Sequence, residues 1–198
     1  MSVHPLLPVL DDLANVIGAT TPAQENAPTP CGGLDVVSLR RHLFGGIEYF
    51  TIVLADPAGD RRPDPRAYTG PDDAESLVAA VGELRATVLA ALADGIEAVP
   101  VKVPALGGTF TGDRVLSMLL AETVVHGWDL ARATGQPWRP DAAAAERAHA
   151  LLSEAIRPEF RGGEGMPFAP EVPVDADAGP LDRLLGFAGR SPRWTPNG

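Results

Sequence analysis

The sequence is poor in cysteine and in uninterrupted hydrophobic runs, and each shortage excludes a class of structure. Cys31 is the only cysteine among 198 residues, so neither an internal disulfide nor a zinc site built from several cysteines can form. A metal ion would need histidine and carboxylate ligands, and the chain has four histidines. No uninterrupted apolar run approaches the roughly 18 residues that indicate a membrane-spanning helix. These shortages favour a globular chain without covalent cross-links.

Positive charge is also in short supply. Lysine and arginine total 16 against 26 aspartate and glutamate residues, which gives a formal net charge of −10. This balance argues against nucleic acid as a partner, because such binding depends on basic side chains that neutralise phosphates. It also argues against docking on an anionic membrane surface. The N-terminal stretch MSVHPLLPVLDDL has no basic segment ahead of an apolar one, so it does not resemble a secretory signal, and we expect a cytoplasmic protein.

The common nucleotide-binding and hydrolase motifs are missing as well. The chain contains no GxGxxG, GxxxxGK[ST], GxSxG, HExxH or CxxC pattern. Dinucleotide binding, P-loop chemistry and α/β-hydrolase chemistry therefore lose the sequence features that normally support them. Any catalytic or binding site would therefore be built from a less common arrangement of polar residues.

What the chain does contain is a series of amphipathic segments separated by glycine and proline. Glycine and proline account for 21 and 20 residues, and they cluster between segments whose apolar residues recur with helical spacing. In one segment, for example, five apolar residues share a helical face: Leu77, Val81, Leu84, Val88 and Leu92. The spacing predicts four long helices and two C-terminal ones, over residues 5–17, 35–55, 73–94, 113–133, 141–156 and 180–188.

Local signals refine the prediction for individual segments. Asp35 is a suitable N-cap for the second helix. Gly45 and Gly46 weaken that helix internally and indicate a close neighbour or a slight bend. Two extended pieces, 99–103 and 171–174, contain proline, so neither predicts a strand.

Together these segments predict a mainly α fold. Four core helices with long Pro/Gly-rich connections are typical of a four-helix bundle, here with extra C-terminal helices. A chain of 198 residues suits one domain. We expect that domain to span residues 1–198, with the bundle core at about 5–134 and a C-terminal extension at about 135–198.

One pair of residues on the fourth predicted helix has the spacing of a metal site. Glu122 and His126 stand at i and i+4, which places both side chains on one helical face, where they can bind one divalent ion. His42, beside the apolar Leu39 and Leu43 of the second helix, is the candidate third ligand. Two histidines and a carboxylate leave coordination positions open for water or substrate and suit zinc, iron, nickel or manganese. The alternative is a surface Glu–His pair, but the surrounding LSMLLAETVVHGW is strongly apolar, so a carboxylate there needs a partner.

Other polar residues give weaker indications. Asp129 lies three residues after His126 and could orient its imidazole from behind, or it could pair with Arg132 instead. Arg40 and Arg41 precede the third candidate ligand on the second helix. We expect at least one of these arginines to point to solvent, whereas the other could meet an anionic substrate or cofactor.

Three stretches of the sequence resemble a known family. They are ETVVHGWDLARATGQPW (122–138), PTPCGGLDVVSLRRHL (28–43) and PLDRLLGFAGRSPRW (180–194). The first resembles a strong signature of actinobacterial proteins of the DinB-like superfamily, in the branch of the mycothiol-dependent maleylpyruvate isomerase type N-terminal domain. The second is similar to the family segment in which a Pro-Cys loop leads into a helix bearing a ligand histidine, and the third to the family's closing segment. The resemblance therefore covers nearly the whole chain.

The resemblance implies a four-helix bundle with a divalent metal, often zinc, at one open end. The family's ligands are a histidine on the second helix and an ExxxH or HxxxH pair on the fourth. These positions correspond to His42, Glu122 and His126, the same three residues that the spacing indicates.

The chain also departs from the family pattern. An aromatic residue is usual where this chain has Leu34, and an Arg and an Asp are frequent where it has Val37 and Ser38. These departures indicate a specialised or relaxed loop before the helix that carries the ligand histidine. The isomerase proper has a further C-terminal domain, whereas only about 60 residues follow the fourth predicted helix here.

The resemblance further implies a reaction that uses a low-molecular-weight thiol, which would be mycothiol in an actinobacterium. A divalent ion stabilises a thiolate, which could attack a small electrophile in S-transfer or isomerisation. One alternative is a hydrolase or lyase that uses metal-activated water, with Asp129 as the nearby candidate base. Another is a non-catalytic metal- or ligand-binding bundle. The expected partners are a small-molecule substrate and a small thiol, and because family members associate through bundle faces a homodimer is a further expectation.

Overall fold

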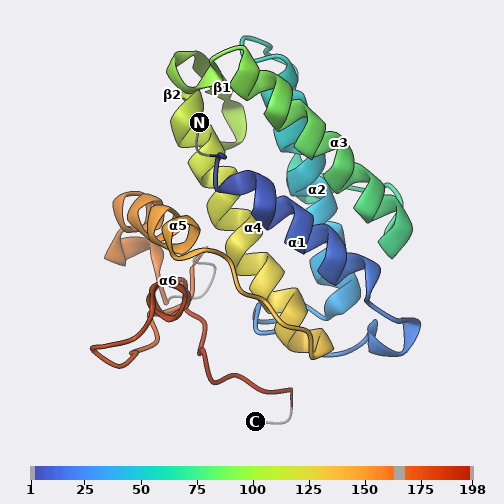
Figure 1. Cartoon of the computed structure of the whole chain (residues 1–198), viewed down its shortest axis with the longest axis vertical. Helices are drawn as coiled ribbons and strands as arrows, with labels where there is room; N and C mark the ends of the chain where they lie inside the picture. Colours follow the sequence, from blue (N-terminus) through green and yellow to red (C-terminus); the bar gives the residue numbers. More distant parts are fainter. Residues whose placement is uncertain (1–2, 163–167, 197–198) are drawn as a thin grey trace.

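Six α-helices account for most of the computed structural model, which describes residues 3–162 and 168–196 (Figure 1). The helices are α1 (Leu6–Gly18), α2 (Val36–Ala55), α3 (Ala74–Ala93), α4 (Gly112–Thr134), α5 (Ala142–Ala155) and α6 (Pro180–Phe187). Short 3₁₀ turns interrupt the connections: η1 (Pro22–Gln24), η2 (Pro65–Ala67), η3 (Ile96–Ala98), η4 (Pro104–Leu106) and η5 (Pro158–Phe160). The prediction of a mainly α fold is confirmed, and each predicted helix agrees with the observed one to within one residue at either end.

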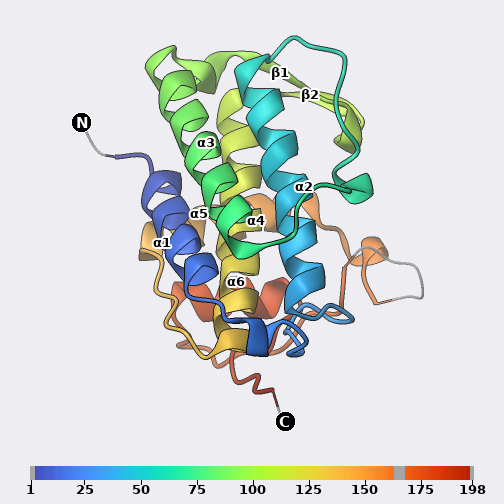
Figure 2. The same ribbon diagram turned by 90° about the vertical axis from the view of Figure 1, so that its right-hand side faces the viewer.

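The four long helices pack in a closed ring around one apolar core. α1 contacts α3 and α4, and α2 contacts the same two helices from the other side. α3 and α4 are therefore diagonal partners, and Figure 2 shows α4 behind the pair formed by α2 and α3. This order makes α2 and α4 neighbours, and the candidate ligands lie on these two helices.

The two C-terminal helices cover the outer side of α4. α5 packs on α4, and α6 packs on α5 (Figure 1). Because the bundle covers one side of α4 and the C-terminal segment the other, 18 of its 23 residues are buried, including the polar Thr123, His126 and Asp129. Buried polar side chains are costly unless they are paired, so α4 requires partners from neighbouring segments.

Aspartate caps fix where two of the bundle helices begin. The Asp35 carboxylate accepts a hydrogen bond from the Ser38 backbone N–H at 2.8 Å, and the Asp73 carboxylate accepts one from the Ser76 N–H at 2.8 Å. The side chain and backbone of Ser38 stabilise the charged form of Asp35 and lower its pKa, and the backbone and side chain of Ser76 do the same for Asp73. The predicted cap at Asp35 is therefore present. It fixes the start of α2 although Leu34, Val37 and Ser38 depart from the family pattern.

A small β-hairpin corrects one prediction. Residues 99–103 were predicted not to form a strand, but β1 (Pro100–Val103) pairs antiparallel with β2 (Gly108–Thr111). The proline is tolerated because it occupies the first position of β1, at the end of the hairpin, and Gly107 closes the connection with a φ of 69°. The second piece, residues 171–174, is not a strand, as predicted.

α3 is apolar enough to meet the length and composition of a membrane span. Its most apolar 18-residue window has a mean hydropathy of 1.6, and 28% of that window is buried inside the protein. The helix nevertheless packs against α1 and α2, and Arg85 at its centre forms an ion pair with Asp11 of α1 at 2.7 Å. These contacts are those of a bundle helix, so the apolar composition of α3 is weak evidence that it spans a membrane.

The adjacent glycines of α2 have different surroundings and provide a test of the packing. A Cβ atom on Gly45 would collide with the backbone carbonyl of Pro65 in η2, whereas one on Gly46 would meet nothing within 4 Å. We expect Gly45→Ala to lower the free energy of unfolding by about 1–3 kcal/mol, because it overpacks against backbone. Gly46→Ala should raise that free energy by about 0.5–1 kcal/mol through its helix propensity. Urea denaturation followed by circular dichroism measures both, and shifts of the same sign would contradict this packing.

Candidate metal centre

Three predicted ligands from two neighbouring helices point toward one another. His42 lies in the N-terminal half of α2, and Glu122 and His126 lie one turn apart on α4. The Nε2 atoms of His42 and His126 are 3.2 Å apart. The Oε2 atom of Glu122 lies 3.3 Å from His126 Nε2 and 3.9 Å from His42 Nε2. Three potential donor atoms therefore converge on one small space.

The spacing of these atoms suits a tetrahedral metal ion. Zinc–nitrogen bonds of about 2.0–2.1 Å in a tetrahedral site separate neighbouring donor atoms by about 3.3 Å. The observed separations of 3.2, 3.3 and 3.9 Å are close to that value. Two imidazole nitrogens that face each other cannot both act as acceptors toward each other, whereas a shared cation would satisfy both. The residues present therefore fit a divalent ion.

Exposure differs across the three side chains. The His126 side chain is 11% exposed, whereas those of His42 and Glu122 are 46% and 54% exposed. His126 thus forms the floor of the site, and the other two form its rim. Any further coordination position would face solvent, which is typical of a catalytic rather than a structural metal site.

The charges of the site are coupled in the absence of a metal. Desolvation alone would raise the pKa of Glu122, but the hydrogen bonds and positive charge of His126 and His42 outweigh it and lower that pKa below its ordinary value. Desolvation would likewise lower the pKa of His126, but its acceptors Asp129, Cys31 and Glu122 raise that pKa well above the usual range. The surroundings of Glu122 therefore stabilise its charged carboxylate through nearby positive charge. A divalent cation bound there would also supply such a charge.

Asp129 supports His126 from the side opposite the candidate ligands. Its side chain is fully buried, and its Oδ2 lies 3.0 Å from His126 Nδ1. We assign this hydrogen bond as Nδ1–H donating to the carboxylate. The other ring nitrogen, Nε2, then faces the candidate ligand atoms of His42 and Glu122. The alternative pairing with Arg132 is absent, because the Arg132 guanidinium donates to the backbone carbonyls of Pro192 and Trp194.

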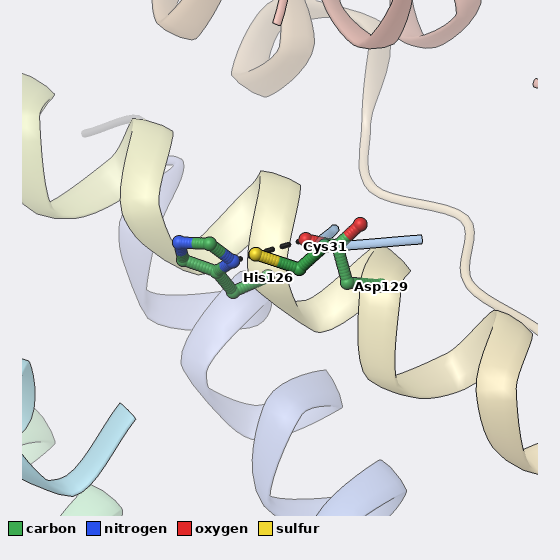
Figure 3. A group of neighbouring side chains, drawn as sticks. All are labelled: Cys31, His126 and Asp129. Carbon is green, nitrogen blue, oxygen red and sulfur yellow. Dashed lines mark hydrogen bonds and ion pairs between the residues drawn. The ribbon is translucent and has the colours of Figure 1, made fainter. Parts of the chain in front are cut away.

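A second group of potential ligands shares His126. The side-chain donor atoms of Cys31, His126 and Asp129 all lie within 4.8 Å of one another, and Figure 3 shows the thiol beside the His126–Asp129 hydrogen bond. The guanidinium of Arg190, however, lies 3.3 Å from the Cys31 sulfur and 3.1 Å from Asp129 Oδ2. Because a cation already occupies this position, the group of His42, Glu122 and His126 is the better candidate.

The two arginines before His42 are already paired. Arg40 is buried, and its guanidinium lies 3.2 Å from the Glu25 carboxylate. Arg41 is exposed and forms an ion pair with Asp72. One arginine therefore points to solvent, as expected, but each has an acidic partner within the chain, so neither offers an unpaired charge to an anionic substrate.

Arg190 is a residue of this cluster that sequence reasoning missed. It follows α6 and reaches Asp129, which lies 61 positions earlier in the chain. The sequence FAGRSP marks a helix end at its glycine, but nothing in it indicates which carboxylate the arginine meets. Only the packing of α6 on α5, and of α5 on α4, brings the two together.

Comparisons with known proteins identify the family of the chain. The sequence model of the mycothiol maleylpyruvate isomerase N-terminal domain matches residues 6–131. Two uncharacterized proteins of Mycobacterium tuberculosis, one from strain CDC 1551 and one from strain H37Rv, are each 32% identical over 187 residues, which cover 92% of this chain and 94% of the relative. No solved structure matches the chain significantly. With a family match over more than half its length, the chain belongs to the mycothiol maleylpyruvate isomerase N-terminal domain family.

Proposed function

We propose that this protein binds one divalent metal ion through His42, Glu122 and His126, and that it uses the ion to activate a small thiol similar to mycothiol. The observation that carries the proposal is the convergence of the three donor atoms at 3.2, 3.3 and 3.9 Å. The reaction would be S-transfer to a small electrophile or its isomerisation. A metal at this site supplies Lewis acidity that stabilises a thiolate at neutral pH.

The three proposed ligands would have different roles in binding the metal and the thiol. His126 is held by Asp129, so its ring presents Nε2 to the site in a fixed orientation. Glu122 contributes negative charge, which leaves a bound divalent ion with a net positive charge that attracts a thiolate. His42 and Glu122 are about half exposed, so a small thiol and its electrophile can approach from the rim. Zinc is the favoured metal, because it accepts nitrogen, carboxylate and thiolate ligands, while nickel, iron and manganese remain candidates.

Two alternatives receive less support from the geometry. A hydrolase or lyase with metal-activated water needs a general base, and Asp129 was the candidate. Its carboxylate is fully buried and bonded to both His126 and Arg190, so it is not free to accept a proton from water at the rim. A structural metal would normally have four protein ligands, and the group found among the described residues has three. We also expect the protein to act in the cytoplasm, and a homodimer remains an expectation.

Metal content provides the first test. Protein purified without an affinity tag and equilibrated with Zn²⁺ should retain about one equivalent by mass spectrometry, and His126→Ala should lose it. His149→Ala is the matched control, because that histidine packs on Phe187, away from the candidate ligands, and should leave the metal content unchanged. A wild-type protein that takes up neither Zn²⁺, Ni²⁺ nor Fe²⁺ would overturn the proposal.

The choice between a thiol and water is tested separately with Co²⁺ in place of the native metal. N-acetylcysteine should produce a sulfur-to-cobalt charge-transfer absorption and alter the visible bands, whereas N-acetylserine should not. The physical reason is that a soft thiolate replaces solvent at the open side of the site. Equal responses to the two compounds, or none to either, would argue against thiol activation and favour one of the alternatives.

A further inference from the structure

We infer that Arg190, from the C-terminal segment, is a positioning residue of the metal centre: it holds the Asp129 carboxylate that in turn orients His126. This inference rests on the proposed function for its effect on metal binding. It adds to the centre a residue that lies beyond positions 6–131, the part matched by the family's sequence model.

Asp129 is a charged side chain that is fully buried beside the site. It has no exposed surface, and a carboxylate in such a position is unfavourable unless its oxygens are paired. His126 Nδ1 approaches Oδ2 at 3.0 Å. One ring nitrogen cannot hold both oxygens, so the orientation of the carboxylate depends on a second partner.

Arg190 supplies that partner with two contacts. Its Nε donates to Asp129 Oδ1 at 3.4 Å and its Nη2 to Asp129 Oδ2 at 3.1 Å. A guanidinium that approaches a carboxylate at two points fixes the plane of the carboxylate as well as its position. The Arg190 side chain is only 14% exposed, so water screens this pair weakly.

The end of α6 places Arg190 for these contacts. The Gly189 N–H donates to the Gly186 carbonyl and the Arg190 N–H to the Leu185 carbonyl, at 3.1 and 2.8 Å. This is the hydrogen-bond pattern of a Schellman cap, and it requires the left-handed backbone that Gly189 adopts with a φ of 79°. Leu184 and Leu185 are fully buried, so α6 is fixed and the residue after its cap is fixed with it.

Arg190 also joins the loop before α2 to the same cluster. Its Nη2 donates to the Cys31 sulfur at 3.3 Å, and its Nη1 donates to the Ala188 carbonyl at 2.8 Å. One guanidinium thus connects three parts of the chain behind His126: the loop that carries Cys31, α4 and the C-terminal segment. Loss of Arg190 would leave Asp129 free to rotate away from the histidine that it orients.

The test compares metal affinity in three folded variants. Arg190→Gln should weaken Co²⁺ binding about ten-fold, since residues that orient a metal-ligating histidine typically contribute 10- to 100-fold. Arg190→Lys should recover part of that loss, because it keeps the charge but not the two-point contact. Arg132→Gln is the matched control: it removes another arginine anchor between α4 and the C-terminal segment, at Pro192 and Trp194. It does not touch Asp129 and should leave the Co²⁺ affinity unchanged.

A double-mutant cycle separates positioning from a general loss of structure. If Arg190 acts through Asp129, Arg190→Gln combined with Asp129→Asn should bind Co²⁺ no more weakly than Asp129→Asn alone. Additive losses, or equal losses in Arg190→Gln and Arg132→Gln, would overturn the inference. Circular dichroism confirms that each variant is folded before its affinity is compared.

A second readout does not depend on metal. In metal-free protein labelled with ¹⁵N-histidine, the Nδ1 proton of His126 should be visible and protected from exchange in the wild type and in Arg132→Gln, but not in Arg190→Gln. If wild-type protein binds no metal and this pattern still holds, the proposed function fails while the positioning link stands. If metal binds but the Nδ1 proton is equally protected in all variants, the positioning inference fails while the metal centre stands.

Discussion

The buried carboxylate of Asp129 needs charged partners, and this need constrains how α4 and the C-terminal segment pack together. It lies fully buried on α4, a helix covered by the bundle on one side and by the C-terminal helices on the other. An unpaired charge in such a place would cost several kcal/mol. Two partners from different parts of the chain meet it, His126 along the same helix and Arg190 after α6. The orientation of a candidate ligand and the docking of the C-terminal segment are therefore linked through one side chain.

The candidate centre is rigid where it is buried and open where it is exposed. His126 is held by Asp129 and barely exposed, whereas His42 and Glu122 have half-exposed side chains on two different helices. Because α2 and α4 are neighbours in the bundle, the rim residues can converge without any long loop. A floor that is fixed before a ligand arrives lowers the cost of ordering the site, and an open rim leaves room for exchangeable ligands.

Sequence reasoning succeeded where the determining signal is local. The helices follow from apolar spacing and from caps such as Asp35, and the Glu122–His126 pair follows from a single helical turn. The β-hairpin was missed because Pro100 argues against a strand and the pairing partner is a different segment. Arg190 was missed because the residue that it meets lies 61 positions away, and no periodicity encodes that contact.

The similarity to other proteins extends past the part that defines the family, into the segment that packs on α4. The family's sequence model ends at residue 131, whereas the M. tuberculosis relatives align over 187 residues. In the structure, α5 packs on the outer side of α4, α6 packs on α5, and Arg190 follows α6 to reach Asp129. A chain that ended at residue 131 would expose apolar surface on α4 and leave a buried carboxylate with one partner fewer. The four helices and the C-terminal segment therefore depend on each other, and together they form the unit that builds the candidate centre.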